Sequence, residues 1–173
     1  MHEYLCLEGS RMRMYYEVAG EDGLDLIEPL WLELRQMHRA RSTHFRDSLG
    51  AKTFQQRRDE LLEKASWGLM RVELARDEQG RLVGYCVATI DNLMTGEVDS
   101  LFVTSMARGM GIGTRLMEGA MRWMEAMGAK RRVLSAIVGN EEVHSFYARF
   151  GFLPKSVILE RPSNAGGRPD KPI

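Results

Sequence analysis

The feature that most constrains this chain is a loop of alternating glycines, Gly109, Gly111 and Gly113, between a strand-like run at 97–103 and an amphipathic segment at 114–127. The first run has the composition of a β-strand, and the second repeats its apolar residues at helical spacing. Glycines before a helix leave backbone N–H groups uncovered at the positive end of the helix dipole. The pattern therefore predicts a strand–loop–helix unit with an anion site, and a phosphate group is the expected ligand.

Two common phosphate-binding motifs do not fit this loop. A dinucleotide fingerprint G-x-G-x-x-G that starts at Gly109 meets Thr114 where a small residue is needed, and one that starts at Gly111 meets Leu116. A P-loop requires Gly-Lys before Ser or Thr, and the sequence contains no such run. A glycine-rich turn without a ligand is the remaining alternative, although three glycines would then cost conformational entropy with no compensating contact.

The whole chain reads as one α+β domain in residues 1–161, followed by a tail at 162–173. Alternating apolar residues predict strands at 70–74 and 83–89, and the nearly all-apolar run at 133–138 predicts another. Further strands are predicted at 11–18, 97–103 and 156–160. Helical patterns run from 29 to 37 and over 53–64, 114–127 and 141–150, the last with Asn140 as its N-cap. The strands at 97–103 and 133–138, joined by a helix, predict a right-handed parallel βαβ unit. The Pro- and Gly-rich tail is predicted to be disordered.

Composition excludes several classes of function. The formal net charge is +0, so no overall basic field attracts nucleic acid or anionic lipid. No apolar run reaches the length of a membrane span or a signal peptide, and the two cysteines form no disulfide framework. We therefore expect a cytoplasmic protein with no nucleic-acid or membrane partner. No metal is expected either, because His38 and His44 have the wrong spacing for a helical pair and no H-E-x-x-H occurs.

Three motifs in order resemble those of one family. Arg108-x-x-Gly111-x-Gly113 resembles the acetyl-CoA signature of the GNAT acetyltransferase superfamily, R/Q-x-x-G-x-G/A. Asn140, then Phe146-Tyr147, then Gly151-Phe152 resembles the family's ending N-x(n)-FY-x(3)-GF. The predicted order of elements also matches that fold over 11–160. The resemblance implies a mixed, mostly antiparallel central sheet, with helices on both faces and one central βαβ unit.

The resemblance also implies a cofactor site for acetyl-CoA. Backbone amides from Gly109 to Thr114 are expected to hold the pyrophosphate, with Arg108 shaping the loop. Backbone groups of the strand are expected to bind the pantetheine arm, where strands 97–103 and 133–138 splay apart, and Asn140 is expected near the opening. The full set of expected cofactor residues is Leu101, Phe102, Val103, Arg108, Gly109, Met110, Gly111, Ile112, Gly113, Thr114 and Asn140.

Two residues are the expected catalytic pair. A lysine-like amine has a pKa near 10.4, so its deprotonation at neutral pH costs about 4–5 kcal/mol, and a general base is useful. Glu97 falls where several members of the family carry that base. Asp99 is the alternative because it points to the same face of the strand. The tyrosine that matches Tyr147 in the family donates to the coenzyme A sulfur, so Tyr147 is the expected acid.

The acceptor is not identified by the sequence. The expected partner is a small-molecule or peptide amine, and small amines, amino acids, aminoglycosides, protein N-termini and lysines all remain open. His38 and His44 lie where the family builds its acceptor pocket. A homodimer is compatible with the resemblance, although no stretch of the sequence supports one. A non-catalytic acyl-CoA-binding or regulatory module is the alternative to an N-acetyltransferase.

Overall fold

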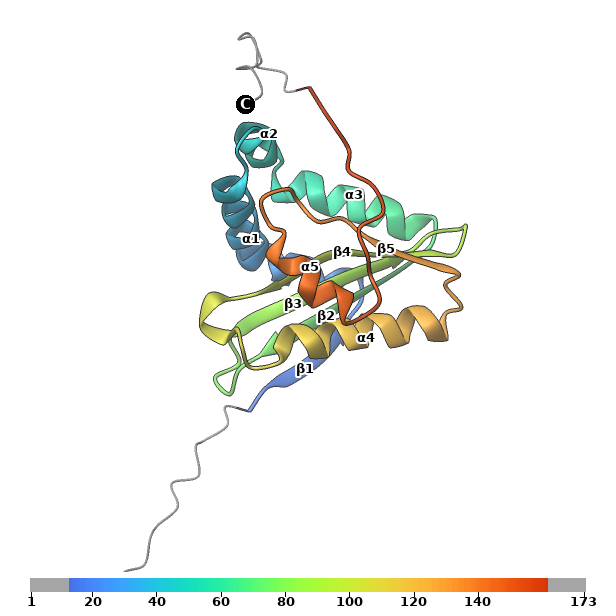
Figure 1. Cartoon of the computed structure of the whole chain (residues 1–173). Coiled ribbons are helices and arrows are strands. Elements are labelled where there is room, and N and C mark those ends of the chain that lie inside the picture. Colours follow the sequence, from blue (N-terminus) through green and yellow to red (C-terminus); the bar gives the residue numbers. More distant parts are fainter. Residues whose placement is uncertain (1–12, 162–173) are drawn as a thin grey trace, which may run out of the picture.

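A five-stranded sheet organises residues 13–161, the part of the chain that the computed structural model describes (Figure 1). The start of the predicted first strand and the predicted disordered tail lie outside these residues. The strands lie in sequence order, and only β4 and β5 are parallel to each other. They are β1 (Tyr15–Ala19), β2 (Leu69–Arg76), β3 (Leu82–Ile90), β4 (Thr95–Val103) and β5 (Arg131–Leu134). The mixed, mostly antiparallel sheet is thus confirmed.

Two helices cover one face of the sheet, α1 (Glu28–Arg41) and α3 (Phe54–Ser66). Proline stands in the first turn of α1, where its missing N–H has no helical partner to lose. Thr53 caps α3 through a reciprocal pair of hydrogen bonds with Gln56. The apolar stripes of both helices pack on alternate strand residues in one core: Leu30, Trp31, Leu34, Phe54, Leu61, Val72, Leu74, Tyr85, Val87 and Phe102.

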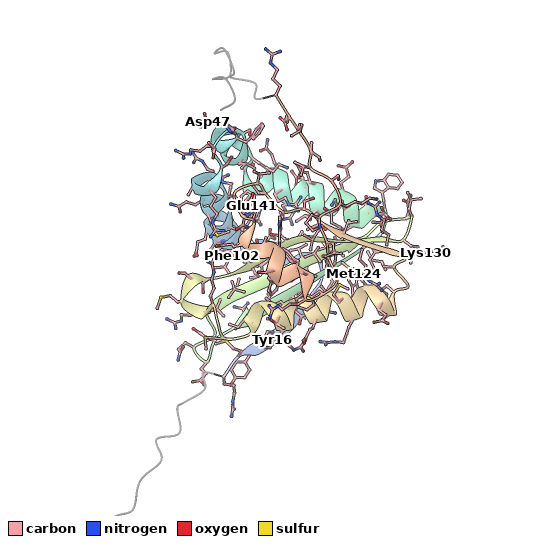
Figure 2. All side chains as sticks on the ribbon, in the orientation of Figure 1. Tyr16, Asp47, Phe102, Met124, Lys130 and Glu141 are labelled. Atoms are coloured by element: carbon pink, nitrogen blue, oxygen red, sulfur yellow. The ribbon has the colours of Figure 1, made fainter. Side chains whose placement is uncertain are left out.

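Helix α4 (Ile112–Ala126) covers the other face and connects β4 to β5. Its predicted apolar stripe is buried at Leu116, Met117, Ala120 and Met124, and Figure 2 shows Met124 on the sheet side of the helix. Met127, which was placed in the same stripe, is 42% exposed because the helix has already ended. Gly128 follows with φ of 77°, the left-handed conformation expected at a helix stop.

The structure corrects the predicted elements at the C-terminal end of the domain. Strand β5 ends at Leu134 instead of residue 138, because the chain then leaves the sheet. Residues 156–160 form no strand: they run extended with Val157, Ile158 and Leu159 exposed. Apolar β-branched residues form a strand only where a neighbouring strand supplies hydrogen bonds, and none does so within 13–161. The βαβ unit therefore lies at the edge of the described sheet.

Two helices also differ from expectation. A short helix, α2 (Arg46–Ala51), lies between the predicted helical patterns at 29–37 and 53–64, where no element was predicted. The last helix, α5 (Glu142–Ala148), has Glu141 at its N-cap, so Asn140 lies outside it. The Asn140 side chain instead accepts a hydrogen bond from Arg41. Sequence alone could not give this contact, because the two residues are 99 positions apart.

A buried carboxylate holds α4 against the sheet. The Glu73 side chain is 3% exposed and accepts a hydrogen bond of 2.8 Å from Arg71 Nη2, while Arg115 Nη1 of α4 lies 3.8 Å from it. Gly119 of α4 lies directly over this carboxylate, and a Cβ there would collide with Glu73 Oε2. The glycine is therefore required for close approach of the helix.

We expect Gly119→Ala to lower the free energy of unfolding by about 1–3 kcal/mol, because the paired, buried carboxylate has no room to move. Gly50→Ala is the matched control: its Cβ would meet only the exposed Arg39 side chain, which can swing away. That variant should be unchanged or gain up to about 1 kcal/mol from helix propensity. Denaturant unfolding of both variants measures these changes in the free energy of unfolding. A stabilised Gly119→Ala variant would contradict the close packing of α4 on Glu73.

Candidate functional site

The glycine loop has a left-handed backbone at two positions. Gly109 has φ of 78° and Gly111 has φ of 79°, and a Cβ at either would meet no atom within 4 Å. Gly111 is the N-cap of α4 and offers no side chain to the first helical N–H groups. These N–H groups therefore remain free to donate to an anion, as the sequence predicted for the loop.

Arg108 fixes the loop to its surroundings. Its Nε donates to the carbonyl oxygen of Val103 at 3.1 Å, and its guanidinium lies 5.8 Å from the centre of the Phe102 ring. Nη2 lies 3.5 Å from Met37 Sδ on α1. The side chain thus ties together the end of β4, the glycine loop and α1, a geometry consistent with the expected shaping role.

The strands β4 and β5 separate beside this loop. Their parallel pairing runs from Thr95 with Arg131 to Val98 with Leu134 and then stops. Beyond that point, 99–103 on one side and 135–137 on the other line a cavity of about 580 Å³. The glycine loop, α1 and α5 complete its walls. The splayed strands expected from the family resemblance therefore border a cavity.

The cavity brings together most of the predicted site residues. Of the expected cofactor residues, Met110 alone is absent from its walls. Tyr147 and Asp99 line it, whereas Glu97 does not. The cavity residues from α1, from the start of α5 and from the position after α5 were missed as cofactor or catalytic residues, because no local motif marks them: Leu34, Met37, Arg41, Glu142, Val143 and Arg149.

Asn140 joins two walls of the cavity. Its side chain accepts from Arg41 at the end of α1, and Arg41 Nη2 also lies 2.5 Å from Glu142 Oε1. Asn140 is 7% exposed. These contacts hold the C-terminal end of α1 against the loop before α5 and the start of that helix.

Tyr147 lies among aromatic rings on α5 and just after it. Its ring centre is 5.1 Å from that of Phe146 and 6.5 Å from that of Phe152, both edge-on. Burial raises the pKa of Tyr147 to about 12, and the nearby Cys86 contributes in the same direction. The phenol is therefore protonated at neutral pH and can act as a hydrogen-bond donor toward the cavity.

The two candidate carboxylates are both engaged by a lysine of α3. Lys64 Nζ lies 2.7 Å from Glu97 Oε2 and 2.5 Å from Asp99 Oδ1. Burial alone would lower the pKa of Lys64, but hydrogen bonds and charge from Asp99 and Glu97 outweigh it and raise that pKa. Lys64 therefore stays charged and competes with any other cation for these carboxylates.

Asp99 has further partners. Its side chain is 0% exposed, and it accepts a hydrogen bond of 2.6 Å from Thr89 Oγ1 and one of 3.4 Å from Arg57 Nη2. Three donors thus surround this carboxylate. It lines the cavity as an acceptor that two cations and a hydroxyl already engage.

The histidines occupy different environments. His38 lines the cavity, and burial followed by the charge of Arg41 lowers its pKa. His44 and His144 are exposed. Residues 13–161 contain no cluster of three or more His, Cys, Asp or Glu side chains suited to a metal ion. The helices in that range include none long and apolar enough to cross a membrane.

Comparisons with known proteins agree with this geometry. The model of the acetyltransferase (GNAT) family matches residues 31–152. N-alpha-acetyltransferase 30 of Schizosaccharomyces pombe is 32% identical over 79 residues, which are 43% of this chain and 53% of that protein. The chain thus spans about half the length of this curated relative.

Solved structures share the fold. Ribosomal-protein-alanine N-acetyltransferase from Brucella melitensis biovar Abortus 2308 is 18% identical with a TM-score of 0.59, over 86% of this chain and 99% of that one. Aminoglycoside N-acetyltransferase AAC(6')-Iy, in complex with CoA, is 15% identical with a TM-score of 0.60, over 92% and 99%. At these identities the likeness concerns the fold alone. Since the family model covers most of the domain, from α1 past α5, the chain belongs to the GNAT acetyltransferase family.

Proposed function

We propose that this protein transfers an acetyl group from acetyl-CoA to a primary amine by direct attack in a ternary complex. One observation carries the proposal: a single cavity runs from the uncovered amides of the glycine loop, past the splayed strands, to Tyr147. An extended cofactor with phosphates at one end and a thioester at the other matches that arrangement. Family membership supports acetyl transfer as the reaction.

The chain's residues fit such a cofactor. Amides from Gly109 to Thr114, including Met110 and Ile112, would hold the pyrophosphate, and backbone groups of Leu101 to Val103 would hydrogen-bond the pantetheine arm. Arg149 offers a second guanidinium near the loop, because its Nη2 lies 3.5 Å from Thr114 Oγ1. Asn140 would lie beside the pantetheine while keeping its contact with Arg41. When bound, acetyl-CoA supplies an activated carbonyl group.

Tyr147 would act on the sulfur by donating a hydrogen bond. Complete transfer of a proton from a phenol with a pKa of about 12 to a thiolate with a pKa near 8.5 would cost about 5 kcal/mol. A hydrogen bond carries no such cost, and it strengthens as negative charge develops on its acceptor. We therefore assign Tyr147 the role of a donor that stabilises the departing sulfur.

Glu97 remains a predicted base. The family resemblance places the base at this position of β4. However, the Glu97 carboxylate pairs with Lys64, and Glu97 does not line the cavity. A base role for Glu97 would require Lys64 to leave. For the acceptor, peptides with a free α-amine come first in a screen, because the curated relative is named an N-alpha-acetyltransferase.

Acetyl-CoA at about 100 times its dissociation constant should stabilise the fold by about 2.7 kcal/mol, measured as a rise in Tm. NAD and ATP should raise Tm far less. Release of free thiol in the presence of peptide, small-molecule and aminoglycoside amines then measures turnover. A Tm shift without thiol release would indicate a non-catalytic acyl-CoA-binding module, and no shift with any acyl-CoA would refute the cofactor assignment.

Tyr147→Phe removes one hydroxyl that makes no hydrogen bond within the described part of the chain, so its Tm should change little. Turnover should fall by about 10- to 30-fold, with little change in KM for acetyl-CoA, because the hydrogen bond acts mainly in the transition state. Tyr15→Phe is the matched control, on exposed β1 outside the cavity, and should keep full activity. An unchanged kcat in Tyr147→Phe would remove the residue from the mechanism.

A further inference from the structure

We propose that His38 of α1 accepts the proton of the acceptor amine, and that the acceptor is an α-amine. This inference rests on the proposed function and names its base and substrate class. It places the base on the helical wall of the cavity and not on the carboxylates of β4. Four observations support it: the position of α1, the state of the carboxylates, the free imidazole and the charges around it.

Helix α1 presents one stripe of residues to the cavity, Leu34, Met37, His38 and Arg41. Contacts on either side of His38 hold this stripe in place. Met37 Sδ lies 3.5 Å from Arg108 Nη2 at the glycine-loop side, and Arg41 binds Asn140 and Glu142 at the other side. His38 lies between these two contacts on the same face. Its imidazole is therefore held over the space between the glycine loop and the start of α5.

The competing carboxylates are poorly placed to accept a proton. The Asp99 side chain is fully buried and receives hydrogen bonds from Lys64, Thr89 and Arg57, so a proton there would remove the negative charge that pairs with the two cations. Glu97 does not line the cavity and shares Lys64. In contrast, the His38 imidazole takes part in none of the hydrogen bonds or ion pairs found among residues 13–161. Among these three residues, His38 has the free acceptor atom.

Burial and one neighbouring cation keep the His38 imidazole neutral. Arg41 lies on its own helix, Arg108 comes from the glycine loop, and Asp99 comes from β4. Glu142 and Arg149 come from α5 and the residue after it, and the phenol of Tyr147 is uncharged. Burial and then the charge of Arg41 lower the pKa of His38 from its ordinary value of 6.5. A neutral imidazole is thus the state present at neutral pH, as a general base requires.

A weakly basic imidazole selects the kind of amine. An α-amine has a pKa of about 8, whereas a lysine amine has a pKa of about 10.4. Proton transfer to the same imidazole is therefore about 10²-fold more favourable from the α-amine. His38 can assist an α-amine and gives much less help to a lysine side chain.

Two protons leave the amine nitrogen during the proposed acetyl transfer. One proton of the bound R–NH₃⁺ passes to the His38 imidazole, and the freed nitrogen lone pair forms the C–N bond to the acetyl carbonyl carbon. The C–S bond breaks with its electron pair on sulfur, which Tyr147 faces as a donor. The second proton of the nitrogen passes to sulfur, giving the amide and the free thiol. His38 then releases its proton to solvent.

The test is a pH profile of kcat/KM with an α-amine peptide, in His38→Gln, His44→Gln and Glu97→Gln variants. The wild type should lose activity as pH falls through the His38 pKa, below 6.5. His38→Gln should lose about 10²-fold at neutral pH and show no such acidic limb, since its amide does not titrate. His44→Gln, with an exposed residue outside the cavity, should match the wild type, and Glu97→Gln should keep the acidic limb.

Two further measurements separate catalysis from folding. Imidazole added to His38→Ala should restore part of the lost rate, which a merely structural role would not allow. The His38 ring resonances, assigned by comparison with His38→Gln, should titrate below pH 6.5 in the free protein.

A wild type that turns over no amine refutes the proposed function and this inference together. A wild type that turns over while His38→Gln keeps both rate and acidic limb refutes this inference alone. Loss of the limb in Glu97→Gln, with the limb kept in His38→Gln, would return the base to β4. A preference for lysine side chains over α-amines would refute the acceptor class.

Discussion

The left-handed backbone at Gly109 and Gly111 is the constraint on which the site depends. It lets the loop after β4 enter α4 while the first N–H groups of that helix stay uncovered. Helix α4 then packs Leu116, Met117 and Met124 under the sheet and returns the chain as β5, parallel to β4. A parallel pair that stops after Val98 and Leu134 leaves the gap in which a cofactor arm can bind. One local conformation thus sets both the uncovered helix amides and the position of the cavity.

Charged residues are paired differently on the α3 side and on the α1 side of the cavity. On the α3 side, Lys64 and Arg57 neutralise Asp99 and Glu97, so that β4 presents engaged carboxylates. On the α1 side, Arg41 is occupied by Asn140 and Glu142, and the neighbouring His38 is left without a bond in the described part of the chain. Acidic residues on a strand next to the cavity can therefore serve the structure, while a histidine of α1 lines the cavity.

Local patterns predicted most of the fold and the glycine loop before α4. Strand alternation, the α4 stripe and the glycine loop depend on neighbours in sequence, and the structure confirms them. The misplaced features depend on distant partners. Residues 156–160 have strand composition but no neighbouring strand, and Asn140 resembles an N-cap but bonds to Arg41. The pairing of Lys64 with Glu97 likewise joins a helix to a strand, and no local sequence pattern relates these two residues.

The central claim is that the left-handed glycine backbone holds the cofactor phosphates, and calorimetric titration of coenzyme A into two valine variants tests it most directly. Gly111→Val and Gly80→Val impose the same strain, because both glycines have positive φ and open space around a Cβ, but Gly80 lies in the turn after β2, outside the cavity. We expect affinity to fall at least tenfold in Gly111→Val and to stay at the wild-type value in Gly80→Val. Equal affinities in the two folded variants would contradict the account and place the phosphates elsewhere.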